Sequence, residues 1–137
     1  MSLQPLLEAA PQVQIHVAAV LLATLLAVTI FLNRKGTSFH KLVGWTYVVL
    51  MTVTAVSAIF IRRSPEDSFP NIAGYTPIHL FVVMTGISLP LAIVHIKAGR
   101  VRQHAGAMIG LFIGGIVIAG VLAFLPGRIM HAAVFGG

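Results

Sequence analysis

The chain has 137 residues, of which 58% are hydrophobic and only 9% are charged, and its mean hydropathy is +0.98. A small water-soluble domain cannot bury this much apolar surface, so the composition excludes that class and favours a membrane protein. The net charge of +6 requires no nucleic-acid partner, because the basic residues lie at the ends of apolar segments. Cysteine is absent, which excludes disulfides, thiolate ligands and haem attachment through a Cys-x-x-Cys-His motif.

Four segments contain no Asp, Glu, Lys or Arg: residues 13–32, 42–61, 78–96 and 105–125. Each has about 20 residues, the length of helix that crosses the hydrocarbon core of a bilayer. Because backbone polar groups in lipid must be satisfied within the segment, we expect four transmembrane helices. The connections are short, which makes consecutive helices antiparallel neighbours. The sequence therefore predicts an all-α membrane protein, with residues 1–137 folded as a single up-down-up-down four-helix bundle.

Positive charge is distributed unequally between the two sides of this predicted bundle. The first and third connections carry six basic residues and no acidic one: Arg34, Lys35, Lys41, Lys97, Arg100 and Arg102. On the other side the charges cancel: Glu8, Arg62, Arg63, Glu66, Asp67 and Arg128. The positive-inside rule then places both termini outside, in a multi-pass protein of the bacterial inner (cytoplasmic) membrane.

One histidine opens each predicted helix: His16, His40, His79 and His104, in chain order. His16 and His79 fall on one diagonal of the bundle at the outer face, and His40 and His104 fall on the other diagonal at the inner face. A haem iron takes one axial imidazole from each side of a flat ring, so its two ligands come from helices that face each other. The pattern predicts two haem b groups, one held by His16 and His79 and the other by His40 and His104.

Two further residues fit this interpretation. Gly44 lies one turn after His40, where the lack of a side chain leaves room for a ring. Arg128 lies at the outer end, where a guanidinium suits a haem propionate or an anionic substrate. The sequence thus indicates His16, His79, His40, His104, Arg128 and Gly44 as cofactor-binding residues, with the four histidines as ligands of haem iron.

The histidines also allow other interpretations. Three imidazoles at each face would suit zinc, copper or non-haem iron. These sets are His16, His79 and His131 outside, and His40, His95 and His104 inside. A histidine at a helix end is also a common interfacial residue, and in that case the protein is a non-catalytic membrane subunit or a small transporter.

Small residues recur every four positions on the fourth predicted helix, at Gly106, Gly110 and Gly114. A small-xxx-small stripe of this kind allows helices to approach closely. We expect it to mediate contact within the bundle or in a homodimer.

Longer motifs carry a resemblance to a known family. They are His40-x-x-x-Gly44-x-x-Tyr47, then Pro77-x-His79 with Leu89-Pro90-x-Ala92, and finally His104 with Leu125-Pro126-Gly127-Arg128. Together they resemble a bacterial family of predicted four-helix membrane proteins described as a domain of unknown function. The architecture is also similar to that of transmembrane di-haem b-type cytochromes, which hold one haem near each face on a four-helix core. That likeness implies electron transfer across the membrane, with a quinone or a small redox substrate as partner and lipid around the bundle.

Overall fold

The computed structural model describes residues 1–63 and 72–136. Three long helices are α2 (Pro11–Leu32), α3 (Ser38–Phe60) and α4 (Leu80–Lys97), the last preceded by the 3-10 turn η1 (Pro77–His79). The fourth is built from α5 (Val101–Phe112), the π-helical segment η2 (Ile113–Ile118) and α6 (Ala119–Ala123). Two short helices, α1 (Gln4–Leu7) and α7 (Ile129–Phe135), flank the set. No strand forms in the described residues, where Ile72 and Tyr75 make only an isolated bridge.

The prediction of an all-α protein with four membrane-crossing helices is confirmed, because four helices are long and apolar enough to span a bilayer. The helices begin earlier than the charge-free segments do, at Ser38 instead of residue 42 and at Val101 instead of residue 105. Lys41 and Arg102 lie in these first turns, where long basic side chains reach the interface. The Thr37 hydroxyl caps α3 by accepting a hydrogen bond from the His40 backbone N–H at 3.1 Å.

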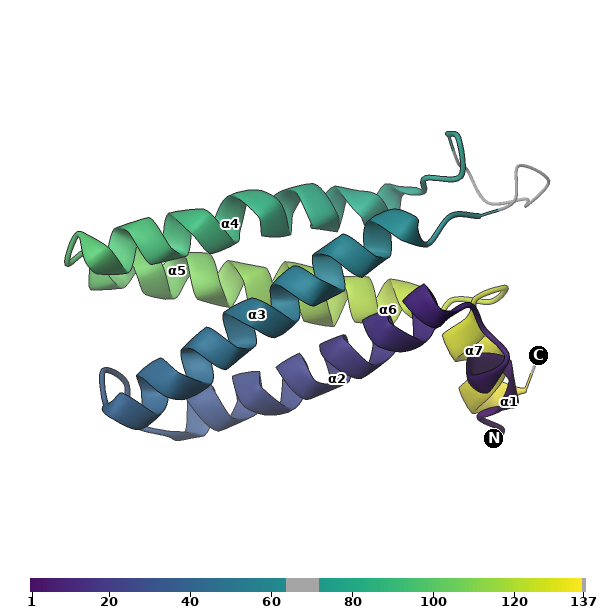
Figure 1. The fold of residues 1–137 in the computed structure, drawn as a ribbon, viewed down its shortest axis with the longest axis horizontal. Coiled ribbons are helices and arrows are strands. Elements are labelled where there is room, and N and C mark those ends of the chain that lie inside the picture. The colour runs from purple at the N-terminus through teal and green to yellow at the C-terminus, as the bar shows by residue number, and fades with distance from the viewer. Residues whose placement is uncertain (64–71, 137) are drawn as a thin grey trace.

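The four long helices pack in chain order, α2 on α3, α3 on α4, and α4 on α5. Both chain termini lie at one end of the bundle, beside α1 and α7 (Figure 1). We call this the terminal end, and the opposite end, with connections 33–37 and 98–100, the hairpin end. At the terminal end the Ser2 N–H donates to the Ala133 carbonyl at 2.9 Å and joins α1 to α7. From the hairpin end, α2 and α3 diverge toward the terminal end (Figure 1).

A short backbone motif closes the hairpin end after α4. The Gly99 N–H donates to the Ile96 carbonyl and the Arg100 N–H to the His95 carbonyl, at 3.1 and 2.8 Å. Gly99 has a φ of +72°, the left-handed conformation that this helix-ending pattern requires and that glycine adopts without strain. The chain can therefore turn directly from α4 into α5.

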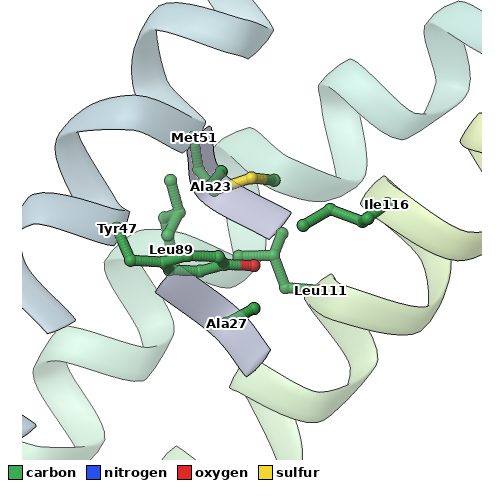
Figure 2. Close-up of a cluster of buried hydrophobic side chains, with 7 residues drawn as sticks. All are labelled: Ala23, Ala27, Tyr47, Met51, Leu89, Leu111 and Ile116. Carbon is green, nitrogen blue, oxygen red and sulfur yellow. The ribbon is translucent and has the colours of Figure 1, made fainter. Parts of the chain in front are cut away.

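The core lies in the middle of the bundle and draws on all four long helices (Figure 2). It consists of Ala23, Ala27, Tyr47, Met51, Leu89, Leu111 and Ile116. Alanines at positions 19, 23 and 27 are buried and spaced by four, so α2 presents a stripe of small residues toward the core. This stripe explains the close packing of α2 on α3.

The three glycines spaced by four on the fourth helix do not all pack within the bundle, contrary to the expectation. Gly106 and Gly110 are exposed, and a Cβ at either would meet nothing within 4 Å. Only Gly114 is packed, with its Cβ position 2.6 Å from Met84 Cε. Contact within the bundle is therefore a wrong prediction for Gly106 and Gly110, while their use in a homodimer stays a prediction. The π-helical turn that begins at Ile113 changes which residues face the core, because its wider turn breaks the four-residue period.

Tyr47 carries the first testable consequence of this packing. Its side chain is only 2% exposed and reaches into the core cluster (Figure 2), yet within the described residues its hydroxyl has no hydrogen-bond partner. An unpaired buried hydroxyl costs about 1–3 kcal/mol. We expect Tyr47→Phe to raise the free energy of unfolding by about 1 kcal/mol, whereas Tyr47→Ala should lower it by about 3–5 kcal/mol. Equilibrium unfolding in mixed micelles measures both, and a destabilised Tyr47→Phe protein would show that the hydroxyl has a partner.

Candidate cofactor site at the terminal end

A cavity of about 660 Å³ lies at the terminal end, within the usual size range of small-molecule and cofactor sites. Its walls come from α2, α3, α4, the η2–α6 segment and the turn before α7. Most of the lining is apolar, and the wall on the fourth helix includes four small residues, Gly115, Ala119, Gly120 and Ala123. The polar lining residues are His16, Thr24, Thr54, Thr76, His79, Thr85 and three arginines, Arg62, Arg63 and Arg128. We call this space the terminal cavity.

His16 projects from the start of α2 into the terminal cavity and is half-buried. Its Nδ1 lies 2.9 Å from the Thr54 carbonyl oxygen and 3.2 Å from the Ser57 hydroxyl. A carbonyl oxygen only accepts hydrogen bonds, so Nδ1 carries the proton and donates to Thr54. Nε2 then keeps its lone pair, and no residue of the described chain bonds to it. Histidines that ligate metals are held in this way, with the other ring N–H bonded to a carbonyl.

His79 also lines the terminal cavity, but both of its ring nitrogens are engaged. Nε2 lies 3.1 Å from the Ala58 carbonyl and 3.0 Å from the Ile61 carbonyl. These carbonyls lie at the end of α3, where the Ala58 carbonyl also accepts a hydrogen bond from the Ile61 backbone N–H at 3.1 Å. Nδ1 accepts a hydrogen bond from the Thr76 backbone N–H at 3.1 Å and completes a capping box around η1. His79 therefore braces the start of the third span against the end of the second.

Three arginines line the terminal cavity. Arg62 donates to the Tyr75 hydroxyl at 2.8 Å and lies over its ring, 4.9 Å from the centroid. Arg63 donates to the Gly127 carbonyl at 2.8 Å. Burial lowers the pKa of the half-buried Arg128 guanidinium, and the nearby charge of Arg63 lowers this pKa further. Three basic side chains thus line the same cavity as His16.

The residues at the terminal cavity fit a haem. The free Nε2 of His16 is a suitable axial donor, the apolar walls suit the macrocycle, and the arginines suit its carboxylates. The sequence identified His16, His79 and Arg128, and the structure brings all three to one cavity. Sequence analysis did not identify the Thr54 carbonyl, Gly115 or Gly120 as parts of this site. A sequence cannot show which backbone carbonyl accepts a hydrogen bond. The glycines and alanines of the fourth span, however, could have indicated space for a ligand beside that helix.

The hairpin end brings together the second predicted pair. His40 lies in the first turn of α3 and His104 in the first turn of α5, at the same end of the bundle. Nδ1 of His104 donates to the Ala92 carbonyl at 2.9 Å, which again leaves Nε2 with its lone pair. Nδ1 of His40 is buried and has no partner in the described part of the chain. Gly44 leaves open space beside its Cα.

Neither His40 nor His104 lines the terminal cavity or a second, smaller cavity of the described residues. This smaller cavity, of about 40 Å³, is lined by Ala27, Ile30, Phe31, Tyr47, Met108 and Phe112. The hairpin end therefore offers two imidazoles, and neither of these two cavities reaches them. The site at the terminal end is the better defined of the two.

The tri-histidine alternative does not form. All six histidines lie in the described part of the chain, and no group of three or more His, Cys, Asp or Glu side chains there could hold a metal ion. His131 lies in α7 with its ring 5.2 Å from that of Phe135, and it is absent from the terminal cavity lining. At the hairpin end, Nδ1 of His95 is buried without a partner in the described residues.

Comparison with known proteins agrees with the architecture. Searches of the curated proteins and of the solved structures found no match. A family model described as "Predicted membrane protein (DUF2306)" matches residues 13–134. The matched range contains nearly all of the four membrane-crossing helices. The chain belongs to this family of predicted membrane proteins.

Proposed function

We propose that the protein is a b-type membrane cytochrome that moves electrons across the bacterial inner membrane, with a quinol, a quinone or a small redox molecule as its partner. The observation that carries the proposal is the orientation of His16, whose Nε2 keeps its lone pair at a cavity of about 660 Å³. In this proposal one haem b occupies the terminal cavity and a second is held at the hairpin end by His40 and His104. Haem supplies one-electron chemistry that the chain's own side chains lack.

The remaining residues have defined tasks toward that group. His16 would offer the lone pair of Nε2 to the iron, while the Thr54 carbonyl holds the ring through Nδ1 and raises the basicity of the imidazole. Arg63 and Arg128 offer charge-assisted hydrogen bonds to carboxylates at the mouth. The apolar walls exclude water from the macrocycle and thereby influence its potential.

Titration with hemin tests the proposal directly. The protein, produced without haem and placed in lipid nanodiscs, should give a sharp Soret band that saturates at two hemins per chain. Saturation at one hemin per chain would support the terminal site and contradict the proposed haem at the hairpin end. If no Soret band develops, the cytochrome function is wrong, and a non-catalytic subunit or a transporter becomes the better account of the structural role of His79.

Arg128 is expected to contribute to haem affinity without ligating the iron. Arg128→Gln removes a charge at the mouth of the terminal cavity, and a hydrogen bond to a charged group is worth about 1.5–3 kcal/mol. We therefore expect the affinity of the terminal site for hemin to fall by roughly 10- to 100-fold, while the band positions of the bound haem stay the same. Arg34→Gln, an exposed charge at the other end, is the matched control. Equal hemin affinities for Arg128→Gln and the control would contradict this role.

The orientation in the membrane also follows from the proposal and has its own test. The hairpin-end connections and the helix turns beside them carry six basic residues, so this end should face the cytoplasm and the terminal end the outside. Since the chain has no cysteine, single cysteines introduced at exposed positions report topology without background. Ser2→Cys should react with an impermeant maleimide on intact spheroplasts, and Ala98→Cys should react only after the membrane is permeabilised. The reverse pattern would contradict the orientation.

A further inference from the structure

The bonding of His79 is incompatible with simple axial ligation of iron. Its Nε2 lies 3.1 and 3.0 Å from two carbonyl oxygens at the end of α3, and therefore carries a proton in place of a free lone pair. Its Nδ1 is occupied by the Thr76 N–H. His16 and His79 thus share the terminal cavity, but only His16 has a nitrogen with an available lone pair.

Freeing His79 would have a structural cost. Rotation of the imidazole away from α3 would leave the Ala58 and Ile61 carbonyls without this donor and would open the capping box of η1. A further contact opposes rotation, because the Tyr75 ring packs edge-on against His79 at 5.0 Å between centroids. Tyr75 is in turn bonded to Arg62. His79 is therefore held by the end of α3, by Thr76 and by Tyr75.

We infer that, if the terminal cavity holds the proposed haem, His16 is its only imidazole ligand and the opposite coordination position is open to a small exogenous ligand. The inference rests on the proposed function and gives it a ligand class: a diatomic molecule or a similarly small anion. Arg62, Arg63 and Arg128 line the same cavity, and a guanidinium can donate hydrogen bonds to such an anion. His79 is then a positioning residue that keeps the second and third spans together at the site. The terminal haem becomes a reaction site as well as an electron carrier.

The experiment uses protein in which His40 and His104 are both alanine, so that only the terminal site holds haem, and the wild type beside it. Electron paramagnetic resonance should show a high-spin ferric signal, and the dithionite-reduced haem should bind carbon monoxide. In the wild type, carbon monoxide should bind one haem of the two, since a bis-histidine iron has no open position.

Two substitutions separate a ligand from a positioning residue at His79. His79→Gln keeps an N–H donor for the α3 carbonyls but supplies no strong iron ligand. It should leave haem content, spin state and the carbon monoxide spectrum unchanged, whereas His79→Ala should lower the melting temperature and retain that spectrum in the folded fraction. Two results would overturn the inference and leave the cytochrome proposal standing. One is a low-spin terminal haem that does not bind carbon monoxide. The other is a change of the terminal haem from low spin to high spin in His79→Gln. A wild type that binds no hemin overturns the proposed function and the inference with it.

Discussion

His16→Ala is expected to remove the haem of the terminal cavity and to reduce the haem content from two per chain to one. The imidazole of His16 is the one whose Nδ1–H is fixed on the Thr54 carbonyl while Nε2 stays available beside the cavity. His79 cannot substitute for it without giving up its bonds to the end of α3. Loss of a ligand should therefore cost far more than the 10- to 100-fold typical of an outer-shell partner.

The measurement is the pyridine haemochrome content per chain, with the visible spectrum of what remains. His131→Ala is a matched control, because His131 lies at the same end but outside the terminal cavity lining. It should keep both haems. A His16→Ala protein that retains two haems with an unaltered spectrum would exclude His16 as a ligand.

Gly120→Phe should have an effect of similar size by filling the terminal cavity. Gly120 lines this cavity, and a Cβ there would meet no atom within 4 Å, so a larger side chain can enter the free space without displacing the backbone. The phenyl ring then occupies volume that a macrocycle needs. We expect terminal haem affinity to fall by at least about 100-fold, as for other losses of shape complementarity in a binding pocket.

Gly110→Phe is the control for Gly120→Phe. Gly110 lies in the same membrane-crossing span and is exposed, and a Cβ there would also meet nothing within 4 Å. It lines neither of the two cavities described above. Haem content and melting temperature should be measured for both proteins. A Gly120→Phe protein that is stable and binds haem as the wild type does would show that the cofactor does not use this space. If both variants lose haem equally, the effect lies in helix packing.

The membrane-crossing helices were predictable because lipid imposes a simple demand on composition. A helix in hydrocarbon must be apolar over its whole length, and four such segments stand out in the sequence. Their first turns were not predictable from charge alone. Lys41 and Arg102 lie inside helices, since a long basic side chain can extend from the first turn to the interface.

The sequence could predict which histidines lie at the same end of the bundle, but it could not predict their hydrogen bonds. Histidines at matching ends of diagonal helices must lie at similar depth, and His16 and His79 do reach one cavity. Their partners, however, are backbone carbonyls of Thr54, Ala58 and Ile61. Every residue has a carbonyl, so the sequence could not distinguish a histidine that is free to ligate from one that braces two helices.

Helix packing shows the same limit. The glycine stripe at Gly106 and Gly110 faces outward, whereas alanines 19, 23 and 27 face the core. Both stripes have small residues spaced by four, and only the position of the neighbouring helices decides which is used. The π-helical turn at Ile113–Ile118 shifts the fourth helix midway, and a residue pattern read with a constant period cannot show such a shift.

The most direct test of the central claim is a visible spectrum of the detergent-purified protein, oxidised and then reduced with dithionite, with haem quantified per chain. The cytochrome account predicts a red protein whose Soret band shifts on reduction and whose α band sharpens, with two haems per chain of the b type, since no cysteine is present to attach them. A protein that is colourless after expression with added haem precursor, and that stays colourless with hemin, would contradict it.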